Sequence, residues 1–148
     1  MIVNIHIQAE DFDLGDEVAA LGDDGAGAVA SFVGLVRGGG GLTALTLEHY
    51  PGMTEREIGR IVDAAAARWT LTGVTVIHRV GRLEVGAQIV LVAVAAAHRG
   101  QAFEACQFLM DHLKTRAPFW KQEERGGEST WVEARESDAA AAERWRRK

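Results

Sequence analysis

The chain has 148 residues, of which 47% are hydrophobic and 25% are charged, and its net charge is −5. This composition fits one globular domain and excludes a disordered chain, and the negative charge argues against salt-driven nucleic-acid binding. No apolar run approaches the roughly 20 residues that span a bilayer, the first residues carry no export signal, and Cys106 is the sole cysteine, so we expect a cytoplasmic protein without a membrane segment or an internal disulfide.

The first third of the chain contains three predicted strands and one short helix. Alternating hydrophobic residues predict a strand over Met1–Gln8, and early acidic residues favour a short helix over Asp13–Leu21. The mostly apolar segment Gly27–Val36 predicts a second strand, and the glycine run Gly38–Gly41 must form a loop. The alternating segment Leu42–His49 should pair with Gly27–Val36 as a long hairpin.

A helix and two further strands are predicted next. Thr54-Glu55-Arg56-Glu57 matches a capping box and predicts a helix from Thr54 to about Arg68. Val74–Val80 and Gln88–Ala97 are predicted strands joined by a turn. The second of these is apolar on both faces, so it should lie in the centre of its sheet.

The last third contains the best-defined helix and a hairpin. Gln101–Arg116 has a helical pattern and ends at Pro118; the expected inward-facing residues are Phe103, Cys106, Phe108, Leu109 and Leu113. Strands over Phe119–Glu124 and Ser129–Glu133 flank Arg125-Gly126-Gly127-Glu128, which is a hairpin signature.

The order of these elements predicts an α+β fold with mixed or antiparallel sheets and about three helices. We expect one domain over residues 1–136. Residues 137–148 should form a C-terminal tail that is weakly helical or disordered.

Lysine placement gives the strongest chemical signal. Lys114, Lys121 and Lys148 are the only lysines, whereas 13 of the 16 basic residues are arginines. A lysine can lose its proton when its surroundings lower its pKa, and an arginine cannot. The chain reversal at Pro118 could bring Lys114 and Lys121 to one pocket wall, where Arg116 would depress the pKa of either amine. The alternatives are chance placement in an arginine-rich chain and a solvated basic helix end.

Two other cationic positions suit anion binding. His98 and Arg99 stand where an apolar strand ends and a helix begins, so backbone N–H groups and a guanidinium could hold an anion there. The alternative is that His98 caps the strand and Arg99 is solvated. Arg37 precedes the glycine run and could bind phosphate, or it could be an edge-strand charge that discourages aggregation.

The remaining histidines and the cysteine have structural interpretations. His49 and His78 lie within strand patterns and are interpreted as structural, and His6 and His112 receive no role. Cys106 lies on an apolar helix face and is interpreted as packing. The histidines and carboxylates show no ligand spacing, so we expect no metal and no cofactor.

A series of short blocks runs in order from Gly27 to Ser137. The most specific is Leu113–Lys121, with Leu45–Met53 upstream; the others are Phe32–Arg37, Val76–Gly81, Ala97–Arg99, Phe103–Ala105 and Trp131–Ala134. Together they resemble the large, catalytic subunit of molybdopterin synthase. Two departures are a short, nearly all-glycine loop after Arg37 and Leu35 at a position that is often polar or basic in the family.

The resemblance implies an α+β fold with a hammerhead-like subdomain and a sulfurtransferase activity. Such enzymes convert a cyclic pyranopterin monophosphate into molybdopterin by installing two sulfurs as a dithiolene. The sulfur arrives as a thiocarboxylate on the C-terminal Gly-Gly of a small ubiquitin-like partner subunit. The assembly is a heterotetramer around a large-subunit homodimer, and residues of both large subunits can complete one site.

The resemblance also implies roles for individual residues. Lys114 and Lys121 match the catalytic lysines. The positions that match substrate-binding or pocket residues are Leu35, Val36, Arg37, His98, Arg99, Gln122 and Glu123, to which the residue-based argument adds Arg116. A non-catalytic dimeric scaffold that docks a ubiquitin-like tail is the main alternative. A phosphoester hydrolase would require a metal cluster or a nucleophile–base pair.

Overall fold

The computed structural model describes the backbone of residues 1–132 and 136–147, and the side chains of these residues except 136–139 and 147. Glu133 of the last predicted strand, Ala134 of the Trp131–Ala134 block and Lys148 of the basic tail therefore lie outside the described residues. The α+β class predicted from the sequence is confirmed, and the described residues contain four α-helices rather than about three.

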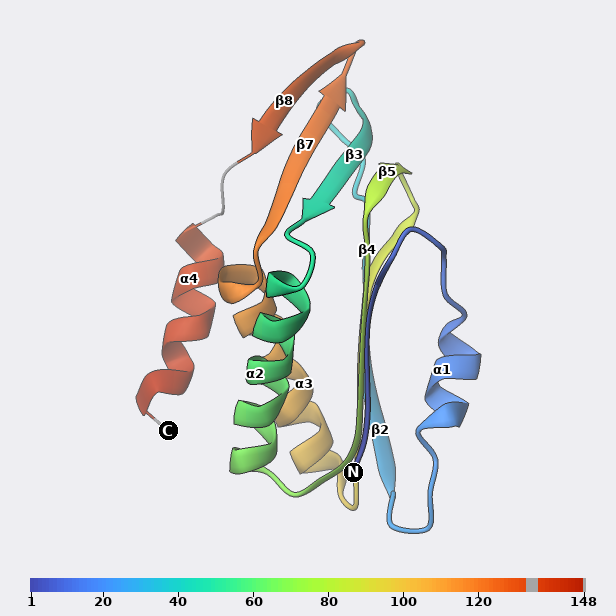
Figure 1. The fold of residues 1–148 in the computed structure, drawn as a ribbon, viewed down its shortest axis with the longest axis vertical. Helices are drawn as coiled ribbons and strands as arrows, with labels where there is room; N and C mark the ends of the chain where they lie inside the picture. Colours follow the sequence, from blue (N-terminus) through green and yellow to red (C-terminus); the bar gives the residue numbers. More distant parts are fainter. Residues whose placement is uncertain (133–135, 148) are drawn as a thin grey trace.

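Four strands form the main sheet, which α1 covers on one face and α2 and α3 cover on the other (Figure 1). Their order across the sheet is β1 (Ile2–Gln8), β4 (Leu71–Arg79), β6 (Gln88–Ala96) and β2 (Ala28–Leu35). The helices are α1 (Leu14–Ala20), α2 (Met53–Arg68) and α3 (Arg99–Arg116). β1 runs parallel to β4, whereas β6 is antiparallel to both β4 and β2.

The core lies on both faces of β6, which is central as its apolar sequence predicts. Val90, Val92 and Val94 pack with the α2 and α3 side chains. Leu91 and Ala93 on the opposite face pack with Phe12 and Leu21, which flank α1. Alternate side chains of a strand point to opposite faces, so a strand covered on both sides is apolar throughout.

A second sheet projects from one end of the main layer (Figure 1). Its order is β5 (Gly81–Glu84), β3 (Leu42–His49), β7 (Phe119–Arg125) and β8 (Glu128–Val132). The predicted β7–β8 hairpin is confirmed; Gly126 and Gly127 both have positive φ in its two-residue turn, as a type I′ turn requires. This sheet carries a small apolar core of its own, made by Val36, Leu45, Leu47 and Leu83.

The predicted hairpin between β2 and β3 is wrong. β2 pairs with β6 in the main sheet, whereas β3 pairs with β5 and β7 in the second sheet. The segment Val36–Gly41 therefore carries the chain from one sheet to the other. Gly39, Gly40 and Gly41 have φ values of 120°, 59° and 79°, which glycine adopts readily and other residues rarely do.

Two local predictions about helices are also wrong. The N-cap of α2 is Gly52, whose backbone N–H donates to the Glu55 carboxylate at 3.1 Å, so Thr54 lies inside the helix instead of capping it. Phe103 of α3 does not point into the core, because 65% of its surface is exposed. Cys106, Phe108, Leu109 and Leu113 are buried as predicted.

The C-terminal segment packs against α3. It consists of α4 (Glu136–Glu143) and a 3₁₀ turn (Arg144–Arg147). Trp145 is buried and donates its indole N–H to the Asp111 carboxylate at 2.7 Å. Within the described residues, each helix is too short or too polar to cross a bilayer.

Candidate active site

A cavity of about 790 Å³ lies where the two sheets meet the C-terminal end of α3. Its wall combines the end of β2, the glycine loop, β3, β7 and the last turns of α3. The apolar part of the wall includes Phe32, Leu35, Leu47, Met110 and Phe119. This volume suits a small organic molecule, and we call the cavity the cleft.

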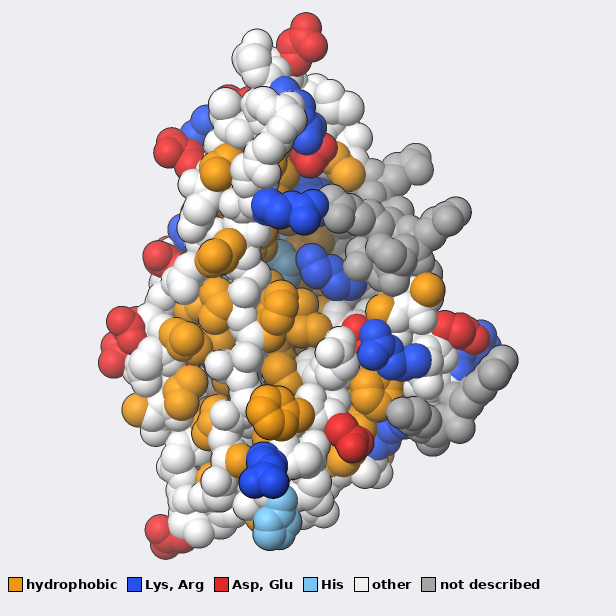
Figure 2. Space-filling model, turned by 180° about the vertical axis from the view of Figure 1, so that it is seen from behind, with side chains coloured by type: hydrophobic (Ala, Val, Ile, Leu, Met, Phe, Trp, Pro, Cys, Tyr) orange, Lys and Arg blue, Asp and Glu red, His pale blue; other side chains and the backbone are white. Residues whose placement is uncertain are grey.

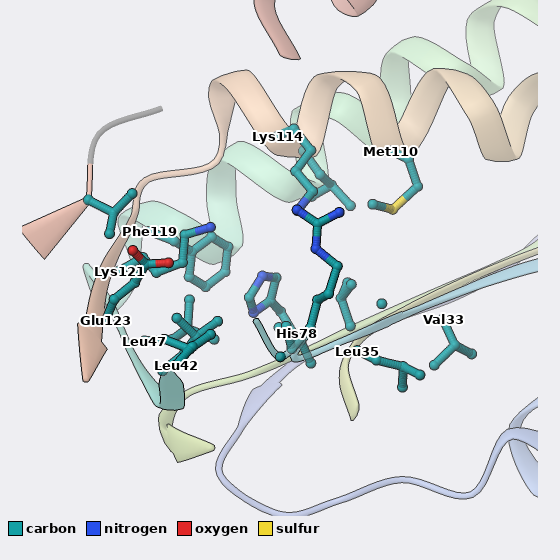
Figure 3. Close-up of a pocket in the computed structure, with 18 of the residues that line it drawn as sticks. Val33, Leu35, Leu42, Leu47, His78, Met110, Lys114, Phe119, Lys121 and Glu123 are labelled. Carbon is teal, nitrogen blue, oxygen red and sulfur yellow. The ribbon is translucent and has the colours of Figure 1, made fainter. Parts of the chain in front are cut away.

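Both candidate lysines line the cleft (Figure 3). Lys114 lies in the last turn of α3 and Lys121 lies in β7. Between them, Ala117 has extended backbone angles (φ −74°, ψ 126°), as expected for a residue before proline, so the helix ends and the chain turns into β7. The side chains of both lysines point toward His78 and Phe119 in the same space.

A buried threonine fixes the turn between the two lysines. The hydroxyl of Thr54 in α2 donates to the Pro118 carbonyl at 3.0 Å and accepts the Tyr50 backbone N–H at 2.9 Å. Thr54 has no exposed surface, so both hydrogen bonds are shielded from water. The start of α2 is thereby tied to the segment that orients Lys121.

The charge of the cleft is predominantly positive. Among its described lining residues, four are cationic, namely Arg37, Lys114, Lys121 and Arg125, and Glu123 is the single anionic one. Arg125 donates hydrogen bonds to the Gly40 carbonyl at 3.0 Å and to the Glu123 carboxylate at 2.8 Å. It therefore connects the glycine loop to β7 at the edge of the cleft. A cation-lined cleft with apolar walls attracts anionic ligands and strengthens its charge–charge interactions.

His78, at the end of β4, forms part of the cleft wall. Its ring stacks on Phe119 with centroids 3.8 Å apart, and its Nδ1 lies 2.9 Å from the Arg79 carbonyl oxygen. Burial lowers the pKa of His78 to about 4; the charges of Lys114, His49 and Lys121 lower it further, whereas the hydrogen bond to Arg79 opposes the shift. His78 is therefore neutral at pH 7.

Some residues that were expected near the lysines line the cleft and others do not, because side chains alternate between the two sides of an extended chain. Leu35 and Arg37 line the cleft, whereas Val36 between them is buried in the small core of the second sheet. On β7, Lys121 and Glu123 line the cleft, and Gln122 is not among its lining residues. Successive side chains of an extended chain point to opposite sides, which explains why Val36 and Gln122 face away from the cleft.

Three other expected residues lie away from this cleft. Arg116 forms an ion pair with Glu57 of α2 at 3.0 Å and, as the largest cause, lowers the pKa of that carboxyl. His98 and Arg99 are exposed at the opposite end of α3, and the separation of 15 positions between Arg99 and Lys114 corresponds to about 22 Å of helix. Within one chain, these cations do not join the lysines.

An exposed apolar patch lies between the two ends of α3. Phe103 lies one helical turn from Arg99, and Phe32 and Leu35 are exposed on β2, which packs beside α3. Figure 2 shows hydrophobic side chains gathered on this face of the molecule. We call Phe32, Leu35 and Phe103 the apolar patch.

A family model described as "MoaE protein" matches residues 7–116. The chain belongs to this family. It is 58% identical to the molybdopterin synthase catalytic subunit of Mesorhizobium japonicum, over 96% of this chain and 92% of that protein. It is 54% identical to the Escherichia coli protein of the same name, over 95% of this chain and 97% of that protein.

A solved MoaE structure also matches closely. The molybdopterin biosynthesis MoaE protein from Burkholderia ambifaria superposes with a TM-score of 0.85 at 51% identity, covering 97% of this chain and 98% of that one. The MoaE-family fold is therefore common to both chains.

Sequence reasoning missed several residues that line the cleft of this MoaE-family chain. Among them are His78, Met110 and Arg125. His78 had a usable signal, because it is a polar residue at the end of a strand that is otherwise buried. Met110 also had a usable sequence signal, because it precedes Lys114 by four residues and therefore lies on the same face of the helix. Arg125 was interpreted as part of a turn.

Proposed function

We propose that this chain is a sulfurtransferase, the catalytic subunit of a molybdopterin synthase. In this proposal it moves sulfur from the C-terminal thiocarboxylate of a small ubiquitin-like carrier to cyclic pyranopterin monophosphate and so builds the dithiolene of molybdopterin. The observation that carries the proposal is the convergence of Lys114 and Lys121 on one cation-lined cleft. The names of the relatives support the role in molybdopterin biosynthesis.

The chemistry of the cleft suits both reactants. The pyranopterin phosphate and the carrier thiocarboxylate are anions, and Arg37 with the lysines supplies fixed positive charge for both. The apolar wall around Met110 and Phe119 offers contact area for a flat ring system. We propose that the reaction takes place in the cytoplasm.

We assign different tasks to the two lysines. Lys114 would lie against the terminal thiocarboxylate and steer its attack on the pterin. Lys121, across the Pro118 turn, would transfer protons or stabilise negative charge on the intermediate. The carrier tail would enter the cleft as an extended segment, with its terminal Gly-Gly beside the lysines.

We propose further that the active unit is a homodimer at the centre of a heterotetramer with two carriers. The apolar patch is exposed in the single chain, and burying it against a second copy removes apolar surface from water. A two-fold axis near the patch would bring His98 and Arg99 of the second copy toward the cleft of the first. His98 and Arg99 of the second copy would then complete the anion site.

The proposal is tested by reconstitution. The purified chain is incubated with thiocarboxylated carrier and cyclic pyranopterin monophosphate, and dithiolene formation is measured with a carrier that ends in an ordinary carboxylate as the control. We expect product only with the thiocarboxylate. Tight carrier binding without product would favour the scaffold alternative and contradict the sulfurtransferase proposal.

A further inference from the structure

His78 is fixed in the cleft wall from two directions. Its ring lies almost flat on Phe119, with an angle of 17° between the ring planes, and its Nδ1 is 2.9 Å from the Arg79 carbonyl oxygen. A carbonyl oxygen can only accept a hydrogen bond, so Nδ1 carries the proton and donates it to Arg79. In a neutral imidazole the other nitrogen, Nε2, then has a free lone pair.

The acceptor at Nε2 is unusual in this cleft. The ammonium and guanidinium groups of Arg37, Lys114, Lys121 and Arg125 can only donate hydrogen bonds. The Glu123 carboxylate already receives a hydrogen bond from Arg125 at 2.8 Å. Within the described part of the chain, Nε2 of His78 has no hydrogen-bond partner, and the side chain lines the cavity.

We propose that His78 is a further substrate-contacting residue, whose Nε2 accepts a hydrogen bond from an N–H or O–H group of the pterin ring system. This inference rests on the proposed function and extends it. The cations recognise the charged ends of the reactants, and every small anion would satisfy them. An acceptor at a fixed position adds a requirement for a donor on the ring, which favours a pterin over phosphate-bearing molecules that have no donor at that position.

The surroundings of His78 keep this acceptor available. Burial and the neighbouring charges of Lys114 and Lys121 disfavour the imidazolium form and hold the pKa of His78 near 4. The Nε2 lone pair is consequently not blocked by a proton at neutral pH. The stack on Phe119 and the bond to Arg79 limit rotation of the ring, so little side-chain freedom is lost when a ligand binds.

Two substitutions test the hydrogen-bond acceptor of His78 separately from the stacking of its ring. His78→Phe keeps a flat ring that can stack on Phe119 but has no lone pair. His78→Gln can bring an amide oxygen close to the position of Nε2. We expect His78→Phe to weaken binding of cyclic pyranopterin monophosphate about tenfold, the usual effect of one hydrogen bond, and to raise KM with little change in kcat. His78→Gln should recover most of the affinity.

The binding measurement is made by calorimetry without the carrier, and the carrier-dependent assay is run in parallel. If the wild-type chain makes dithiolene and His78→Phe binds the pterin as tightly as wild type, the inference is overturned and the proposed function stands. A wild-type chain that neither binds the pterin nor makes product contradicts both.

A second measurement needs no variant. The ¹⁵N NMR signal of Nε2 in the wild-type protein should move upfield when the pterin binds, since accepting a hydrogen bond shields an unprotonated ring nitrogen. A signal that stays in place at saturating pterin would overturn the inference.

Discussion

Lys114 and Lys121 owe their joint position to a single residue between them. Pro118 forces Ala117 out of the helical conformation, so the helix that carries Lys114 ends and the strand that carries Lys121 begins within a few residues. The sequence block around Pro118 was enough to predict that both amines reach one wall. It did not predict the third group in that wall, because the position of His78 depends on its stack on Phe119, which is far away in sequence.

The buried imidazole of His78 predicts a specific pH dependence of stability. In the folded protein the pKa of His78 is about 4, whereas the unfolded imidazole titrates near its ordinary value of 6.5. Below pH 6.5 the unfolded state therefore binds more protons, and the free energy of unfolding falls as the pH falls toward 4. From pH 7 to pH 5 this group alone should remove about 2 kcal/mol.

Urea unfolding at pH 7 and pH 5 checks this prediction. His78→Gln should lose about 2 kcal/mol less stability than wild type between the two pH values. His6→Gln, which replaces an exposed imidazole, serves as the control and should follow wild type. Equal losses in wild type and His78→Gln would contradict the neutral, buried state of His78.

At the scale of elements, the sequence predicted the strands better than their partners. Leu42–His49 was recognised as a strand from its hydrophobic alternation, and Gly27–Val36 from its mostly apolar composition. Neither pattern carries information on which strand lies alongside, and proximity in sequence suggested a hairpin that does not exist. In the sequence the glycine run resembles a hairpin turn, but in the structure it connects the two sheets.

The turn between α3 and β7 depends on α2 through Thr54. Replacing Thr54 with Val keeps the shape of the side chain but leaves the Tyr50 N–H and the Pro118 carbonyl without their buried partner. We expect the free energy of unfolding to fall by about 1–3 kcal/mol. Thr54→Ser keeps the hydroxyl, so its free energy of unfolding should fall less than that of Thr54→Val. Chemical denaturation measures both, and equal effects of Val and Ser would show that the hydroxyl is unimportant.

At the scale of the whole molecule, the separation of His98 and Arg99 from the lysines is the reason why we propose a site shared between two copies. Arg99 and Lys114 lie at opposite ends of α3, and the helix holds them about 22 Å apart. Phe103, which the helical pattern assigned to the core, is instead 65% exposed, and we propose that a second copy covers it.

Mixed dimers test this arrangement. Arg99→Ala and Lys114→Ala should each be nearly inactive alone. In a mixed dimer one cleft contains Lys114 from one copy and Arg99 from the other, so random mixing should restore roughly a quarter of wild-type activity. The dithiolene assay on co-expressed variants measures the recovery, and each variant mixed with itself is the control. Sites formed within single chains would give no recovery.

The most direct measurement of the central claim is dithiolene formation by Lys114→Ala, compared with Arg56→Ala, which removes an exposed cation elsewhere on the surface. Loss of a charge that stabilises the reacting anion should lower kcat by roughly 10²–10³-fold, with unchanged folding by circular dichroism, and Arg56→Ala should remain near wild type. A folded Lys114→Ala protein that makes dithiolene at the wild-type rate would contradict the assignment of the cleft.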